Sequence, residues 1–150
     1  MLSGRPEDRI RPDPKLTPGA TVNVALNEMC VIGYAARVRH VDRELRNEAF
    51  RLYGLQSVDR RDYELDHLIP ISLGGATNDI KNLWPESRLT EPWGAEVKDM
   101  LEDVLHREVC AGKVDLAVAQ KAIRTDWVAA YEFYVGSEPE QLVLHTRPGP

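Results

Sequence analysis

The stretch from residue 63 to 87 most constrains what this chain can fold into. Its first short apolar run is interrupted by an adjacent acid and imidazole, Asp66 and His67. A Gly-Gly pair at 74–75 follows, and a second short run then begins at Asn82. Short apolar runs bounded by glycine and proline predict two strands joined by a long loop.

Asp66 and His67 are neighbours on the first predicted strand, so their side chains should point to opposite faces. If the strand is bulged or ends at His67, both can converge on one site. A divalent ion held by a carboxylate beside a free imidazole suits phosphodiester hydrolysis, because the ion neutralises the phosphate and the imidazole activates water. The alternative is an acid–imidazole pair that carries no chemistry.

This stretch closely resembles the core of the HNH endonucleases, a family with a ββα-metal fold. The resemblance is most specific in the string Asp66-His67-Leu-Ile-Pro-Ile-Ser-Leu-Gly74-Gly75 followed by Asn82-Leu83. It implies that Asp66 is a metal ligand, that His67 is the general base, and that Asn82 bonds the loop backbone and fixes His67. More loosely, residues 14–134 look like a bacterial subgroup of HNH-like proteins.

The family takes its third metal ligand, commonly His or Asn, from the helix after the second strand. This chain departs from that pattern, because position 91, nine residues after Asn82, is a glutamate. The remaining candidates are Glu96 and Asp99 and, after them, Glu102. Oxygen ligands suit Mg²⁺, which keeps most of its waters, so Mg²⁺ is the expected ion, with Mn²⁺, Ni²⁺ or Zn²⁺ as alternatives. A solvated acidic helix face without metal is the other interpretation of this stripe.

Helical spacing predicts three longer helices. The first spans about 42–53 and ends before Gly54, and the second spans about 95–111. The third begins after Asp115 and continues without interruption to about 135, where it should pack on the second as a hairpin. Residues 21–41 remain open between a short extended piece and a helix over 22–29.

The predicted fold class is therefore α+β, with a ββα-metal core hairpin, mainly helical flanks and a C-terminal helical hairpin. Residues 1–20 carry four prolines and form an extended arm, and residues 136–150 form a tail. Between them, 21–135 make a single nuclease-like domain with its core at 63–111.

The formal net charge of −5 counts against strong non-specific binding to DNA, which usually needs a basic face. The segment between residues 37 and 61 is nevertheless net basic, and it directly precedes the Asp-His strand. Its candidate phosphate-contacting residues are Arg37, Arg39, Arg60 and Arg61. The alternative is a solvated helix face of mixed charge.

No apolar run is long enough to span a membrane, so no membrane partner is expected. The first residues contain no apolar signal core, which predicts either a cytoplasmic protein or one exported after removal of a signal. Cys30 and Cys110 could be two thiols or one disulfide, and without a visible signal we favour reduced thiols.

The sequence thus predicts a metal-dependent endonuclease that hydrolyses phosphodiester bonds in DNA. A catalytically inactive module that keeps the same fold and binds nucleic acid or protein is the main alternative, and the acidic net charge motivates it. A ribonuclease is a third interpretation, although no aromatic-rich RNA platform is visible.

Overall fold

The computed structural model describes residues 9–136, so parts of the predicted arm and tail, 1–8 and 137–150, lie outside the described residues. The described chain is a small α+β domain. Its two strands are β1 (Tyr63–His67) and β2 (Leu83–Ser87). Its α-helices are α1 (Leu26–Met29), α2 (Tyr34–Val38), α3 (Arg43–Leu52), α4 (Ala95–Cys110), α5 (Leu116–Thr125) and α6 (Trp127–Tyr134). Three 3-10 helices are η1 (Arg60–Asp62), η2 (Ile71–Leu73) and η3 (Ile80–Asn82).

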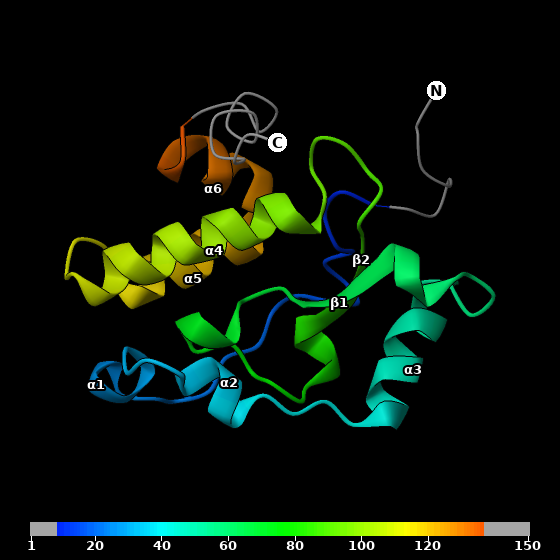
Figure 1. The fold of residues 1–150 in the computed structure, drawn as a ribbon, viewed down its shortest axis with the longest axis horizontal. Helices are drawn as coiled ribbons and strands as arrows, with labels where there is room; N and C mark the ends of the chain where they lie inside the picture. The colour runs from blue at the N-terminus through cyan, green and yellow to red at the C-terminus, as the bar shows by residue number, and fades with distance from the viewer. Residues whose placement is uncertain (1–8, 137–150) are drawn as a thin grey trace, which may run out of the picture.

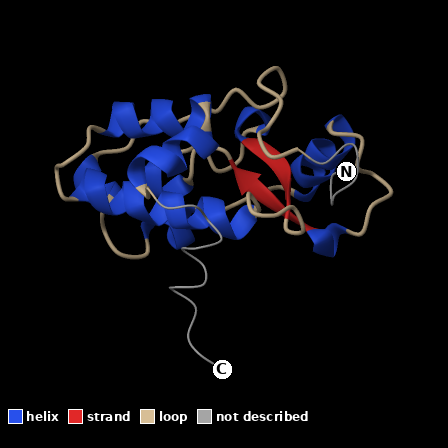
Figure 2. Ribbon diagram, turned by 90° about the horizontal axis from the view of Figure 1, so that it is seen from above, coloured by secondary structure: helices blue, strands red, loops and turns tan. Residues whose placement is uncertain are grey.

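The hairpin and its long loop lie between two groups of helices (Figure 1). On one side α4, α5 and α6 pack on one another, and on the other side α1 and α2 lie below the loop while α3 packs against β2. Seen from above, the two strands lie together with helices on both sides of them (Figure 2).

The two strands are antiparallel, and Asp66 pairs with Trp84 while His67 pairs with Leu83. The first strand ends at His67 and does not continue to residue 71, because Pro70 lacks a ladder donor and the chain enters η2. This early end brings the neighbouring acid and imidazole to the point where the chain turns away from the sheet.

The helix predicted over 42–53 is confirmed as α3, and the helix predicted over 95–111 is confirmed as α4. The prediction of one uninterrupted last helix is wrong, because the helix is interrupted at Asp126 and forms α5 and α6. The backbone of Asp126 is extended, and its carboxylate accepts a hydrogen bond from the N–H of Ala129 at 3.1 Å. Asp126 thus caps a new helix. The apolar spacing continues on both sides of Asp126, so the periodicity gave no indication of the break.

Residues 21–41 form neither a regular strand nor one helix over 22–29. They contain the two short helices α1 and α2, separated by Gly33 with φ of 89°. The short extended piece that the sequence left open is not found at residues 34–38, which belong to α2. The only sheet-like contact nearby is an isolated bridge between Thr21 and Gly75 among the described residues.

The main core lies between the loop and the α4–α6 layer. Its largest buried side chains include Leu101, Leu105, Ile123, Trp127 and Tyr131. A smaller cluster joins α3 to β1, where the rings of Phe50 and Tyr63 meet edge to face at 5.9 Å between centroids. The α3 cluster thus holds the strands, and the main core holds the loop that follows β1.

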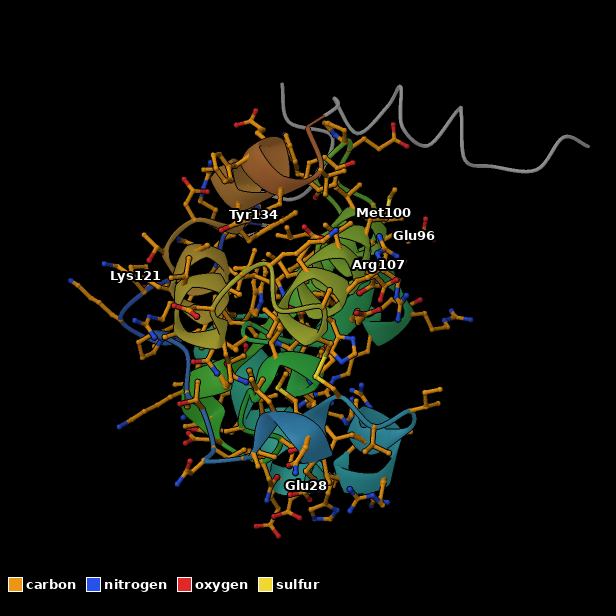
Figure 3. The ribbon with its side chains drawn as sticks, turned by 90° about the vertical axis from the view of Figure 1, so that its left-hand side faces the viewer. Glu28, Glu96, Met100, Arg107, Lys121 and Tyr134 are labelled. Atoms are coloured by element: carbon orange, nitrogen blue, oxygen red, sulfur yellow. A yellow bond between two sulfur atoms is a disulfide. The ribbon has the colours of Figure 1, made fainter. Side chains whose placement is uncertain are left out.

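Cys30 and Cys110 form a disulfide that joins the end of α1 to the end of α4, so our preference for reduced thiols is wrong. The bond lies between these helices in Figure 3. The sequence left both states open because the two cysteines are 80 residues apart, and neither this separation nor the composition predicts that they meet in the fold. Within residues 9–136, no helix is both long and apolar enough to cross a membrane.

Candidate active site

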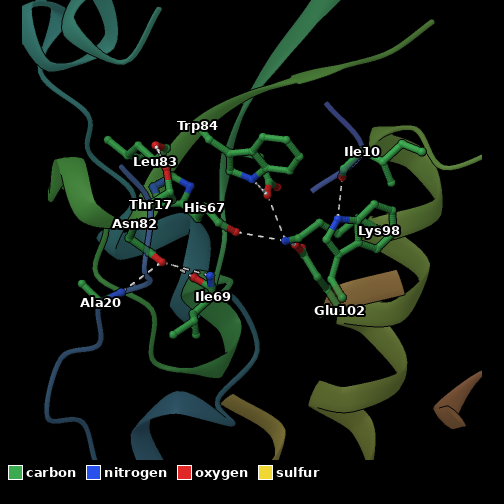
Figure 4. Close-up of polar contacts among 12 residues, drawn as sticks. Ile10, Thr17, Ala20, His67, Ile69, Asn82, Leu83, Trp84, Lys98 and Glu102 are labelled. Atoms are coloured by element: carbon green, nitrogen blue, oxygen red, sulfur yellow. Dashed lines mark hydrogen bonds and ion pairs between the residues drawn. The ribbon is translucent and has the colours of Figure 1, made fainter. Parts of the chain in front are cut away.

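Asn82 ties the loop after β1 to the hairpin. Its amide oxygen accepts hydrogen bonds from the N–H groups of Ile69 and Ala20 at 3.0 and 3.3 Å. Its amide nitrogen donates to the carbonyls of Ile69 and Ala76 at 3.0 and 2.9 Å (Figure 4). Asn82 is fully buried with both amide atoms satisfied, so it anchors the backbone, and it does not line the pocket described below.

The Gly-Gly pair lets this loop fold tightly on itself. Gly74 has φ of 80°, and a Cβ on Gly75 would lie 1.8 Å from the carbonyl oxygen of Ile69. The first glycine is needed for its backbone conformation and the second for the close approach of two backbone segments. The loop therefore returns to the end of β1 and places Thr77 beside His67.

His67 is held in one tautomer by that loop. Its Nε2–H donates to the carbonyl oxygen of Thr77 at 2.9 Å, and a carbonyl can only accept. The neutral ring must therefore carry its lone pair on Nδ1. Burial lowers the pKa of His67, which outweighs the hydrogen bond to Thr77, so the imidazole is neutral near pH 7.

Asp66 uses only one of its two carboxylate oxygens inside the protein. Oδ2 accepts a hydrogen bond from Trp84 Nε1 at 2.8 Å and an ion pair from Lys98 Nζ at 2.9 Å. Oδ1 makes no hydrogen bond within the part of the chain that the structure describes. Asp66 is thus firmly oriented and keeps one oxygen for a further partner.

A pocket of about 110 Å³ opens at the end of β1 and brings the predicted pair together. Its polar lining consists of Arg39, Glu64, Asp66, His67, Ser72, Asp99 and Glu102. Although Asp66 and His67 start on opposite faces of the strand, both residues border the same pocket, at the point where the chain turns away after His67.

The pocket is crowded with carboxylates. Loss of water around Asp99, although that residue is exposed at the rim, raises its pKa to about 7, with Glu64 and Asp66 adding to the rise. Burial likewise raises the pKa of Glu102 to about 8, even though Lys98 acts against the rise. Glu86 lies opposite Glu64 in the sheet and is almost completely buried. Its pKa is also raised by burial, and neither of its oxygens has a hydrogen-bond partner. A cation at this pocket would oppose these pKa shifts, because it favours the ionised carboxylates.

The residues fit a magnesium ion better than a zinc ion. Asp66 Oδ1 and Asp99 could supply two oxygens, and Mg²⁺ readily completes its six positions with water. Among the described residues, no third carboxylate or imidazole is gathered close enough to complete a tetrahedral set with them. The one compact group found there, Cys30, His106 and Cys110, has its two sulfurs in the disulfide and so offers no thiolate.

The other predicted site residues are scattered. Glu96 is exposed on the outer side of α4 and does not line the pocket (Figure 3). Of the four candidate arginines, only Arg39 borders it. Arg37 pairs with Glu28 at 3.6 Å, and Arg61 pairs with Asp59 at 2.8 Å before β1 begins. Arg60 lies over the ring of Phe50, 4.4 Å from its centroid.

Sequence reasoning missed Lys98 and the carbonyl of Thr77. Lys98 lies on the buried face of α4, three residues before Leu101 and seven before Leu105, so a charged residue on an apolar stripe was the available signal. Thr77 could not have been found this way, because its contribution is a backbone oxygen. Compared with known proteins, no family model, curated protein or solved structure matches this chain.

Proposed function

We propose that this chain is a metal-dependent endonuclease that hydrolyses phosphodiester bonds in DNA, with β1, β2 and α4 as a ββα-metal core. The observation that carries the proposal is the state of His67. Its hydrogen bond to Thr77 leaves Nδ1 as an acceptor, and burial keeps the ring neutral beside Asp66 and Asp99. A neutral imidazole with a fixed free nitrogen is what a general base requires.

His67 Nδ1 takes a proton from the attacking water as the oxygen bonds to phosphorus. The carbonyl of Thr77 then stabilises the imidazolium through the Nε2–H that it already accepts. The bond to the leaving 3′ oxygen breaks, and that oxygen takes a proton from solvent. Asp66 Oδ1 and Asp99 would hold Mg²⁺, which when bound offsets the charge on the phosphate and the leaving oxygen.

Arg39 would meet the substrate at the rim of the same pocket. Its side chain is exposed, and within residues 9–136 it makes no ion pair, in contrast to Arg37 and Arg61. A free guanidinium suits a non-bridging phosphate oxygen, which it can bind through two N–H groups. Duplex DNA is the natural first substrate, because the pocket carries no aromatic platform on which unpaired bases could stack.

The test is plasmid nicking with Mg²⁺ against EDTA, comparing the parent with His67→Ala. Loss of the general base should lower the rate by about 100-fold or more, while circular dichroism and the melting temperature change little. His40→Ala is the matched control, because His40 is exposed and bonds Asp42 away from the pocket. A folded His67→Ala protein that cuts at the parental rate would exclude this mechanism.

A non-catalytic binding module is the second candidate, and the ion pair between Lys98 and Asp66 favours it, because a cation already sits on that carboxylate. This candidate predicts stable binding to DNA or protein without cleavage. Cleavage assays with Mg²⁺, Mn²⁺, Ni²⁺ and Zn²⁺ in turn separate the two functions, since a module cuts with none of them.

A further inference from the structure

Lys98 is fully buried in the first half of α4, although a lysine is rarely buried completely. Burial alone would lower its pKa, but the negative charges of Asp66, Glu102 and Glu86 outweigh it and raise the pKa above the ordinary range. Lys98 is therefore a permanent cation inside the protein. Such a costly arrangement needs excellent geometry to persist.

That geometry is complete. The ammonium reaches Glu102 Oε2 at 2.6 Å, Asp66 Oδ2 at 2.9 Å and the backbone carbonyl oxygen of His67 at 3.1 Å (Figure 4). An ammonium has three N–H donors, and here each donor has one acceptor. Two of the three acceptors belong to the adjacent residues that the proposed mechanism uses, so one nitrogen on α4 holds both of them.

We propose that Lys98 is a positioning residue that turns Asp66 Oδ1 toward the pocket and fixes the end of β1 at His67. This inference rests on the proposed function. Because Oδ2 is occupied by Lys98 and Trp84, the carboxylate cannot rotate, and a cation can approach only the other oxygen. Glu102 accepts the remaining hydrogen bond of the ammonium at 2.6 Å, and the proposed mechanism does not use Glu102.

The alternative is that Lys98 only neutralises buried acids and so stabilises the fold. The two roles differ in what they predict for ion affinity. A positioning role makes the affinity of Asp66 for a divalent ion depend on Lys98 even when folding is intact. Groups that orient a metal ligand typically change metal affinity by about 10- to 100-fold when they are removed.

The test uses Mn²⁺ as the probe and measures its binding by electron paramagnetic resonance, without DNA. Lys98→Met combined with Glu102→Gln removes both members of the pair at 2.6 Å, so Glu102 is not left as a buried carboxylate without its cation. We expect its Mn²⁺ affinity to fall by at least about tenfold. Glu102→Gln alone is the control, because its amide oxygen still accepts from Lys98, and its affinity should remain within about threefold of the parent.

A folded double variant with parental Mn²⁺ affinity would overturn the positioning role and leave the proposed function intact. A parent that binds no Mn²⁺ and does not cut would instead overturn the proposed function. If the double variant does not fold, Lys98→Arg keeps the charge but replaces the compact ammonium with a planar fork. Parental Mn²⁺ affinity in Lys98→Arg would then overturn the positioning role.

Discussion

The imidazole of His67 is prepared as a base by one backbone oxygen and by the removal of water around it. The Thr77 carbonyl fixes the tautomer, and burial keeps the ring neutral. Thr77 is itself held in place, because its hydroxyl exchanges hydrogen bonds with the backbone N–H and carbonyl of His40 at 2.9 and 3.2 Å. The segment after α2 thus supports the base through the loop.

The lowered pKa of His67 gives a testable pH dependence. The neutral, active form persists to a lower pH than for a free histidine, whose pKa is about 6.5. At saturating Mg²⁺, the acidic limb of kcat/KM for nicking should therefore have its midpoint below 6.5. The measurement is a pH series of initial rates, and a midpoint at or above that of free histidine would contradict the neutral base.

Asp99 should make stability fall as the pH rises. Its folded pKa of about 7 lies above the ordinary 3.8, so between these values the folded state binds more protons than the unfolded state. Stability is then lost as the pH rises toward 7, and Asp99→Asn should remove this loss. Urea unfolding in EDTA should show the variant gaining on the parent from pH 4 to pH 8, and Mg²⁺ should stabilise the parent more than the variant. If the difference in the free energy of unfolding between variant and parent does not change with pH, the pKa of Asp99 is not raised in the folded state.

Asp66, His67 and Asn82 could be found from the sequence because they stand close together in one motif. Lys98 lies 32 positions after Asp66, and only the packing of α4 under the hairpin brings the two side chains together. The occupied oxygen of Asp66 and the raised pKa of Asp99 likewise depend on tertiary contacts. A single sequence carries no signal for such contacts.

At the scale of elements, the loop between β1 and β2 is as well determined as the strands. The Asn82 side chain makes three hydrogen bonds to it, and the Gly75 N–H donates to the carbonyl of Pro70 at 2.9 Å. Composition predicted a long loop with glycines, but it gave no indication that η2 and η3 make the loop compact. The loop matters because it carries the Thr77 carbonyl to His67.

Gly75→Ala should therefore disrupt the site through the backbone. The added Cβ would lie 1.8 Å from the carbonyl oxygen of Ile69, so one backbone segment must move. We expect a loss of roughly 3 kcal/mol in the free energy of unfolding. Gly112→Ala is the control, because no atom lies within 4 Å there and only its φ of 76° costs about 1 kcal/mol. Equal losses in urea unfolding would refute the close approach.

The disulfide joins the two helix groups across the loop. Because it closes 80 residues of chain, it should stabilise the fold by about 4 kcal/mol, mainly by restricting the unfolded state. Urea unfolding with and without a phosphine reductant measures this difference. A Cys30→Ala/Cys110→Ala variant should have the same free energy of unfolding as the reduced parent, and the reductant should not change it. Free thiols found without reductant would show instead that the bond does not form.

At the scale of the whole molecule, an acidic chain has to bind an acidic polymer if the proposed function holds. The net charge is −5, and carboxylates surround the pocket. A divalent ion would offset that charge locally, and the exposed arginines along the segment from α2 to α3 offer contacts to the DNA backbone. Binding should therefore depend on salt but involve few phosphates.

Arg39 should carry one of those contacts. Arg39→Ala should weaken DNA binding and reduce the slope of log affinity against log salt by about 1, because one phosphate contact is lost. Arg61→Ala is the matched control, since Arg61 is also exposed but pairs with Asp59 at the start of β1, away from the pocket. Its slope should match the parent. Fluorescence anisotropy with a labelled duplex and Ca²⁺ in place of Mg²⁺ measures binding, and equal slopes for all three proteins would remove Arg39 from the interface.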